Sequence, residues 1–161
     1  MSDWFGFKIP TNKRTFLCKK PYTSFTDMTS QQFVSHKPEG LWYAHGNAWV
    51  RWAKANIPES LEESRYLYEV QLHPKQILTL STKPMLKAFD SAFKAKNIYG
   101  FDFAGEYSQV DWPDVATGWA GIEIIPWQRY PRPPWYNSWD VASGCVWGEQ
   151  GVKSIKLLHK R

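Results

Sequence analysis

Residues 37–52, KPEGLWYAHGNAWVRW, and residues 139–147, WDVASGCVW, carry most of the information about the fold. In the first stretch, a short apolar run at residues 40–44 follows a Lys-Pro-Glu-Gly turn, and aromatic residues then recur at helical spacing. This pattern predicts a strand that runs almost directly into a helix over residues 48–55. The second stretch predicts a small-residue turn that leads into another strand.

Outward from these stretches, the alternation of polar and apolar residues predicts five more short strands. They cover residues 14–19, 65–72, 76–80, 121–125 and 152–158. Helices are predicted at residues 84–94 and 111–117, whereas residues 97–108 and 126–134 indicate no regular element. Short strands without a repeating strand-helix-strand pattern favour a single α+β domain over residues 1–161, with a mainly antiparallel sheet and a few short helices.

Composition narrows the class of protein. A chain of 161 residues is long enough for one well-buried core, and no apolar run is long enough to span a membrane. The N-terminal residues lack the pattern of a secretory signal, and the two cysteines form neither a disulfide framework nor a zinc-binding spacing. We therefore expect an intracellular, cytoplasmic, monomeric protein with no membrane partner and no metal.

Charge and aromatic content point to the kind of ligand. The formal net charge is +5, which favours phosphate-bearing partners, although a solvated basic surface explains it equally well. The chain contains ten tryptophans, and aromatic residues make up 17% of it. So many flat rings indicate either an unusually aromatic core or a pocket that stacks on a planar ligand.

Two neighbouring rings and two carboxylates are the first candidate site residues. Trp42 and Tyr43 are adjacent in a predicted strand, so their rings point to opposite faces, one to the core and one to a cleft where it stacks on a ligand. Glu123 lies within an apolar strand and needs either an arginine partner or a cleft. Asp140 is either a turn cap or a functional carboxylate. For both acids the two interpretations stay open.

Histidine and cysteine give weaker signals. His36, near the start of the strand, is a candidate for hydrogen bonding to a ribose or phosphate, and a solvated loop histidine is its alternative. Cys145 follows Ser-Gly but lacks a cysteine-protease signature, so a buried core thiol is favoured over a nucleophile.

The order of predicted elements resembles the ADP-ribosyltransferase fold, over roughly residues 14–158. That family binds NAD in a cleft between two small antiparallel sheets, which implies a split β-sheet here. Its first strand carries Arg or His, which resembles RTFLCK with Arg14 and implies His36 as a substitute. Its second strand carries a tyrosine and runs into a helix, which resembles GLWYAHGNAWVRWA and puts Tyr43 in that place. RYLYEVQLHPKQILTL resembles its next strand pair and SGCVWGEQGVKSIKLL its closing pair.

One departure from the family pattern concerns the catalytic glutamate, because this chain has Ser143 at the place before the closing strand. The resemblance then implies that Asp140 or Glu123 takes over the catalytic role, with Tyr43. Arg14, His36, Trp42, Tyr43 and Ser143 would bind NAD. Paired KPxGLW and WDxxSGCxW motifs also resemble an uncharacterised viral or microbial group.

The resemblance implies an NAD-dependent transferase that moves ADP-ribose to a macromolecular acceptor, either a protein or a nucleic acid. The positive charge favours nucleic acid. The alternative is a non-catalytic module that binds a nucleotide or single-stranded nucleic acid in an aromatic cleft. A third alternative is an interaction protein that docks a partner through the proline-aromatic loop at residues 126–136.

Overall fold

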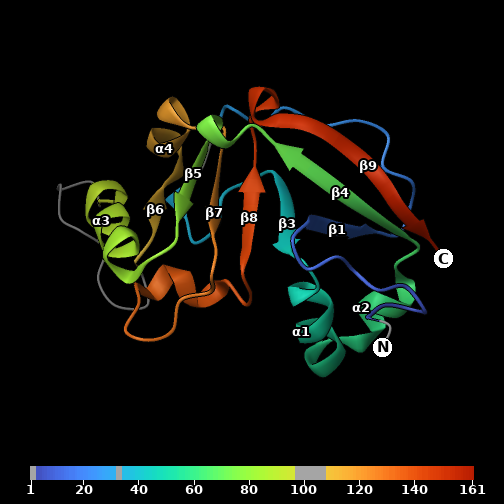
Figure 1. Ribbon diagram of the computed structural model, residues 1–161. Coiled ribbons are helices and arrows are strands. Elements are labelled where there is room, and N and C mark those ends of the chain that lie inside the picture. Colours follow the sequence, from blue (N-terminus) through green and yellow to red (C-terminus); the bar gives the residue numbers. More distant parts are fainter. Residues whose placement is uncertain (1–2, 32–33, 97–107) are drawn as a thin grey trace.

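The computed structural model describes residues 3–31, 34–96 and 108–161. These form an α+β arrangement of a curled, mostly antiparallel sheet with four short helices among the described residues (Figure 1). The strands of the large sheet, in spatial order, are β5 (Ile77–Leu80), β7 (Gly121–Ile124), β8 (Ser143–Val146), β3 (Leu41–His45), β1 (Arg14–Cys18), β4 (Tyr66–Leu72) and β9 (Val152–Lys160). Two further strands, β2 (Val34–Ser35) and β6 (Val110–Asp111), pair separately. Neighbouring strands of the large sheet are antiparallel, except that β5 and β7 are parallel.

The helices lie in two groups, at opposite halves of the sheet (Figure 1). Their bounds are α1 (Ala48–Asn56), α2 (Pro58–Glu63), α3 (Lys83–Phe93) and α4 (Trp112–Gly118). Local signals start two of them: the side chain of Thr82 accepts a hydrogen bond from the backbone of Met85 at the start of α3, and Asp111 does the same for Asp114 in α4. No helix of the described residues combines the length and the apolar character needed to cross a bilayer.

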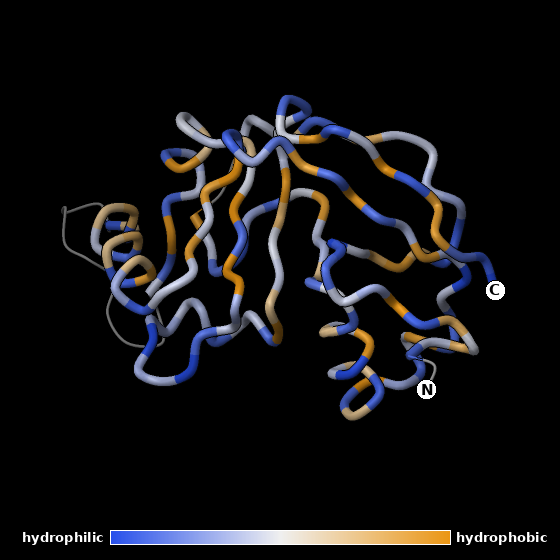
Figure 2. Tube along the Cα trace, in the orientation of Figure 1, coloured by the Kyte–Doolittle hydropathy of each residue, from blue (hydrophilic) through white to orange (hydrophobic). Residues whose placement is uncertain are grey.

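The core consists of three clusters of buried side chains. The largest packs α3, α4 and residues 134–139 against β5, β7 and β8, and four of its tryptophans are at most 1% exposed. The second packs α1 and α2 beneath β1 and β4. The third lies on the opposite face of the sheet and is rich in tyrosine. Figure 2 shows hydrophobic residues recurring along the central strands, as expected for a sheet covered on both faces.

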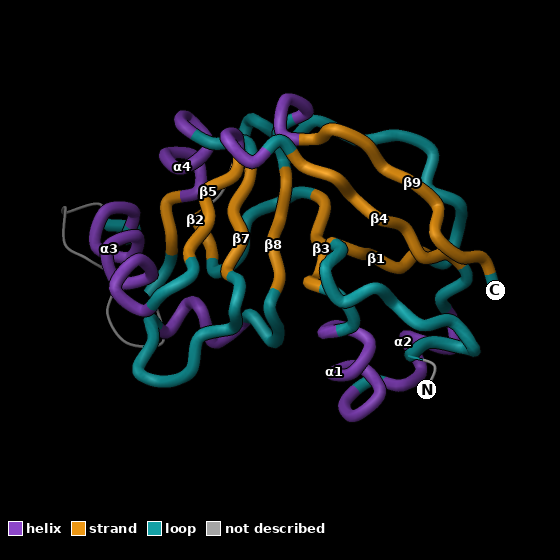
Figure 3. The backbone as a smooth tube through the Cα atoms, in the orientation of Figure 1, coloured by secondary structure: helices purple, strands orange, loops and turns teal. Residues whose placement is uncertain are grey.

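Most predicted elements are present with small shifts of their ends, and the α+β class is confirmed. The expected split of the sheet differs from the structure, because strand pairing continues unbroken from β5 to β9. The two strands predicted as neighbours, β4 and β5, lie in different halves, because the 3-10 turn Pro74–Gln76 carries the chain across the top (Figure 3). Likewise β8 and β9 are not paired with each other.

Three further outcomes concern the loops and cysteines. Residues 97–107, for which the sequence indicated no regular element, lie outside the described residues. The loop expected at residues 126–134 ends in a 3-10 helix, Pro134–Ser138, whose Trp135 and Tyr136 are buried. The expected core position of Cys145 is confirmed; burial raises the pKa of its thiol well above the ordinary value, and Cys18 is also free.

Candidate functional site

A cleft of about 350 Å³ opens on one face of the sheet, between α1 and α2 on one side and residues 139–141 on the other. Ligand pockets typically measure about 300–1,000 Å³, so this cleft has the size of a small-molecule site. Its walls come from β1, β3 and β8, from α1 and α2, and from the segment that precedes β8. The lining residues are Thr15, Phe16, Leu17, Lys37, Trp42, Tyr43, Ala44, Trp49, Ser60, Ser64, Trp139, Asp140, Val141 and Ser143.

Two of the aromatic residues in the lining, Trp42 and Trp49, are partly exposed, and each is supported by another tryptophan. Trp42 packs edge-on against Trp139, with ring centroids 4.8 Å apart and planes at 75°. Trp49 stacks on Trp52 at 5.1 Å and 23°. Because the supporting rings fix these orientations, part of each lining ring is available without rearrangement. A flat ligand ring is the natural partner of such surfaces.

Two opposite charges stand at the cleft. Among the described residues that line it, Asp140 is the only carboxylate and Lys37 the only ammonium group, and both are exposed. The Lys37 Nζ lies 5.2 Å from the centre of the Trp42 ring, so the cation already sits over that ring. An anionic group of a ligand stacked at Trp42 would therefore lie within reach of Lys37.

The backbone on both sides of Asp140 is held firmly. The N–H of Trp139 donates to Tyr136 O at 2.9 Å, and the Trp127 indole donates to Trp139 O at 2.8 Å. On the other side, the N–H of His45 donates to Ala142 O at 2.9 Å. The carboxylate therefore projects from a backbone that is fixed on both sides.

Hydroxyl groups complete the polar lining. Thr15 donates to Gly46 O at 3.0 Å, Ser64 to Ser60 O at 2.8 Å and Ser143 to Val141 O at 2.8 Å. These bonds use the hydroxyl protons, so each oxygen keeps lone pairs with which it can accept a hydrogen bond from a ligand hydroxyl.

A second polar cluster lies on the opposite face of the same strands. Arg14 forms two parallel hydrogen bonds with Glu123, each 2.7 Å long, and the Tyr43 hydroxyl donates to the same carboxylate at 2.9 Å. Thr79 lies 3.5 Å from the other oxygen. We call Arg14, Glu123 and Tyr43 the strand-bridging cluster, because it joins β1, β3 and β7 across β8.

Gly144 makes this cluster possible. It lies on β8 directly between Tyr43 and Glu123 in the register of the sheet. A Cβ at this position would lie 2.4 Å from the Tyr43 hydroxyl and 2.7 Å from the Glu123 Cβ, both closer than side chains can approach. The absence of a side chain therefore lets two residues from non-adjacent strands touch.

The pKa shifts of Arg14 and Glu123 are those of a stabilised ion pair. Burial alone would raise the pKa of Glu123, but the hydrogen bonds and charge of Arg14, with smaller contributions from Tyr43 and Thr79, bring its pKa below the ordinary value. The bond to Glu123 raises the pKa of Arg14. Burial and the Glu123 charge raise the pKa of Tyr43 well above its ordinary value. At neutral pH the cluster is a paired carboxylate and guanidinium with a neutral phenol.

The structure separates the sequence candidates into these two groups. Trp42, Ser143 and Asp140 meet at the cleft, whereas Arg14 and Glu123 belong to the strand-bridging cluster. Tyr43 contributes to the lining, but its side chain is 2% exposed and its hydroxyl is bound to Glu123. Glu123 thus has the arginine partner that sequence analysis left open.

Sequence analysis missed three further features of the cleft. Trp49 was not among the predicted site residues, because its spacing from Trp52 does not show which ring reaches a cavity. Lys37 had no signal beyond its place in the turn, and His36 beside it is not a lining residue. Ser60 comes from α2 and Ser64 is the residue directly after this helix, and neither serine was among the predicted site residues.

Comparisons with known proteins leave the family open. No family model matches the chain, and neither a curated protein nor a solved structure is detectably similar to it. Within the described residues, no three His, Cys, Asp or Glu side chains gather in a way that could hold a metal ion. Function must therefore be argued from the cleft itself.

Proposed function

We propose that the cleft binds NAD and that the protein transfers ADP-ribose from it to a macromolecular acceptor. The observation that carries this proposal is the grouping of two supported tryptophans, one carboxylate and one lysine in a single cleft. The rings provide a stacking surface for nicotinamide, Lys37 a countercharge for phosphate, and the hydroxyls acceptors for ribose. The cleft volume suits a ring with its sugar, and the rest of NAD would extend along the open side.

The order of the central strands supports the same proposal, although the side chains of Arg14 and Tyr43 are bound to Glu123 on the opposite face. In the ADP-ribosyltransferase pattern, the arginine strand and the tyrosine strand belong to the same site, and the second runs directly into a helix. Here β1 and β3 are neighbours, and only Gly46 and Asn47 separate β3 from α1. The helix brings Trp49 to the cleft, beside Trp42 of β3.

The chemistry would ask little covalent work of the protein. The bond between ribose C1 and the nicotinamide nitrogen breaks, and its electron pair neutralises the pyridinium ring. Asp140 would stabilise the positive charge that develops on the ribose and accept a hydrogen bond from a ribose hydroxyl. The acceptor then donates a lone pair to C1 and loses a proton.

The test is nicotinamide release from NAD, measured for the wild type and Asp140→Asn. Removing one preorganised electrostatic group typically costs about 10²–10³ in turnover, so we expect a loss of that size while NAD still binds. Asp114→Asn, an exposed acid in the first turn of α4, is the matched control and should leave turnover unchanged. Equal turnover by Asp140→Asn and wild type would remove Asp140 from the reaction.

A second candidate function is a non-catalytic module that binds a nucleotide or single-stranded nucleic acid. Two observations favour it: Ser143 occupies the place of the family's glutamate, and Glu123 is held by Arg14 outside the cleft. This candidate predicts NAD or nucleotide binding without release of nicotinamide. The release assay therefore separates the two.

A further inference from the structure

One corner of the sheet gathers five exposed cations at the ends of three neighbouring strands. Tyr66 of β4 is in register with both Cys18 of β1 and Lys160 of β9. Two backbone hydrogen bonds continue this alignment past the strands: Arg65 N donates to Cys18 O at 2.9 Å, and Arg161 N donates to Arg65 O at 2.8 Å. We call this set the cation corner: Lys19, Lys20, Arg65, Lys160 and Arg161.

The carboxylates near the corner neutralise only part of this charge. Lys19 pairs with Glu63 in the last turn of α2, and Glu62 is the other acid there. Arg65 and Arg161 each donate to the backbone oxygen of Glu62 at 2.7 Å, which orders the two guanidinium groups at the C-terminal end of the helix. Five cations thus face two exposed carboxylates, and the arginines keep further N–H donors.

Two aromatic rings contact these cations, one on each face of the sheet. The Arg161 guanidinium lies 3.6 Å from the centre of the Phe5 ring, and Phe5 is 49% exposed. The Lys160 Nζ lies 5.7 Å from the centre of the partly exposed Tyr66 ring. Basic side chains alternating with flat rings are the combination that binds a phosphate backbone and stacks unpaired bases. An acidic peptide would satisfy the charges but would make no use of the rings.

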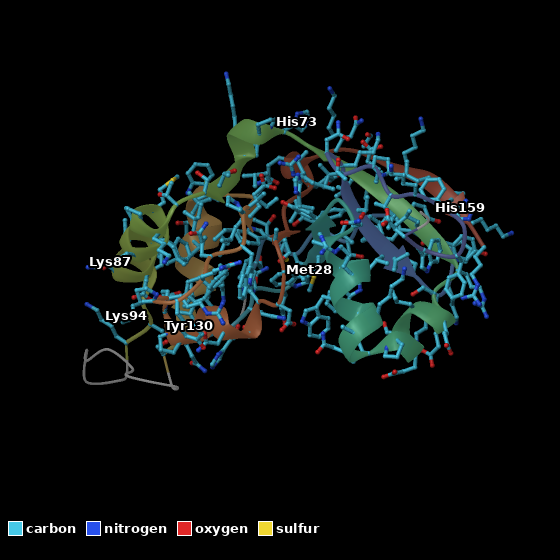
Figure 4. All side chains as sticks on the ribbon, turned by 60° about the horizontal axis from the view of Figure 1, so that its bottom comes forward. Met28, His73, Lys87, Lys94, Tyr130 and His159 are labelled. Atoms are coloured by element: carbon cyan, nitrogen blue, oxygen red, sulfur yellow. The ribbon has the colours of Figure 1, made fainter. Side chains whose placement is uncertain are left out.

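The corner adjoins one end of the cleft. Ser60 of α2 and Ser64, the residue directly after this helix, line the cleft, and Arg65 follows Ser64 directly. Leu17 lines the cleft two residues before Lys19. Figure 1 shows α2, the C-terminal end of the chain and the ends of β1, β4 and β9 together at this side, and Figure 4 shows His159 there, far from Lys87 and Tyr130. A strand held at the corner can therefore extend towards the cleft.

We infer that the cation corner binds the backbone of single-stranded nucleic acid and that this strand is the acceptor presented to the cleft. Naming it the acceptor rests on the proposed function, whereas binding at the corner does not. Lysine and arginine contact the phosphates, and Phe5 and Tyr66 stack on bases. A duplex is disfavoured, because its bases are already stacked on one another and cannot cover these rings.

The test is the salt dependence of binding to a fluorescein-labelled single-stranded oligothymidylate, followed by anisotropy. The Lys20→Ala/Lys160→Ala double variant removes two corner cations, and Lys75→Ala/Lys87→Ala, at the opposite half, is the control. Each phosphate contact contributes about 0.7 to the slope of log K against log salt, so the corner variant should lose about 1.4 from the magnitude of that slope. The control should keep the wild-type slope.

Phe5→Leu separates stacking from charge. We expect its affinity for the oligothymidylate to fall about tenfold, with unchanged affinity for inorganic polyphosphate. The inference is overturned if the slope is unchanged in the corner variant or if the control loses as much slope. It is also overturned if a duplex binds equally well, or if Phe5→Leu keeps its affinity for the oligothymidylate. The shift in melting temperature produced by NAD distinguishes this inference from the proposed function. Lost oligonucleotide binding with an intact NAD shift refutes the corner alone, and a missing NAD shift in wild type refutes the proposed function alone.

Discussion

The cleft and the strand-bridging cluster are built from adjacent residues of the same strands, yet they have opposite properties. Trp42 and Tyr43 are neighbours in β3, and Thr15 and Arg14 are neighbours in β1. On one face, polar groups line a cavity of about 350 Å³ and two of them, Lys37 and Asp140, are exposed. On the other, arginine, glutamate and tyrosine satisfy one another. Ionisable residue types alone therefore do not identify a functional site; their partners do.

The comparison assigns stability to the strand-bridging cluster and ligand binding to the cleft. Mutations can separate these two roles. The largest effect on stability should come from Arg14→Met. It leaves the Glu123 carboxylate, 5% exposed, without its partner, and breaking a buried ion pair in this way costs about 3 kcal/mol. The measurement is urea unfolding at pH 7. In the Arg14→Met/Glu123→Leu double variant no unpaired charge remains, so it should be more stable than Arg14→Met; a double variant that is less stable would contradict the account.

The same pair predicts a dependence on pH. Because the folded-state pKa of Glu123 is lowered, its stabilising contribution is fully present above the ordinary value of 4.5 and is lost as the pH falls through the folded-state pKa. Without Arg14, burial raises the pKa of Glu123, so the difference in unfolding free energy between wild type and Arg14→Met should start to shrink above pH 4.5 and continue to shrink as the pH falls. A difference that stays constant down to pH 3 would show that Glu123 is not the group concerned.

Gly144→Ala should have the next largest effect. The new methyl group must push Tyr43 away from Glu123, and overpacking of this kind costs about 2 kcal/mol. Gly118→Ala is the matched control, since a Cβ there meets nothing within 4 Å. Thermal unfolding of both variants decides the point: similar melting temperatures for the two would mean that the contact across β8 is unimportant.

Trp42→Leu should weaken ligand binding through the cleft. Loss of one stacking surface costs about 1–3 kcal/mol, and we expect about 1.5 kcal/mol of NAD affinity by isothermal titration calorimetry. Trp119→Leu, a partly buried tryptophan outside the lining, controls for the general loss of a large ring. Equal weakening by both substitutions would argue against stacking at Trp42.

Tyr43→Phe should have the smallest effect of these substitutions. In contrast to Trp42→Leu, it should change stability and not NAD affinity. It removes one hydrogen bond to Glu123 and should lower the unfolding free energy by about 1 kcal/mol. Affinity for NAD should not change, because the hydroxyl lies in the cluster and not in the cleft. A loss of NAD affinity without a loss of stability would place Tyr43 in the binding site after all.

Local signals in the sequence were sufficient to predict the helices and strands, but not to predict which strands pair with each other. The strand-to-helix transition after β3, the proline-started α3 and the opposite orientations of Trp42 and Tyr43 all follow from residues close in the chain. The separation of β4 from β5 cannot be inferred in this way, because no residue near Pro74 indicates that the chain crosses to the other half of the sheet. The fold class was therefore accessible, and the strand order was not.

The candidate site was predicted in part for the same reason. Asp140, Trp42 and Ser143 lie in or beside the two most distinctive stretches and do reach the cleft. Glu123 was ambiguous, because its partner Arg14 is 109 residues away and the contact depends on a glycine in a third strand. Pairings over such distances require the sheet register, which the sequence pattern did not provide.

The most direct test of the account is the shift in melting temperature produced by NAD in wild type, Trp42→Leu and Tyr43→Phe. A ligand that binds the folded state raises the melting temperature, and at a fixed ligand concentration the rise is larger for tighter binding. We predict a clear shift in wild type, an equal shift in Tyr43→Phe from a lower starting temperature, and a much smaller shift in Trp42→Leu. The absence of a shift in wild type at millimolar NAD, or its loss in Tyr43→Phe rather than in Trp42→Leu, would contradict the assignment of the cleft.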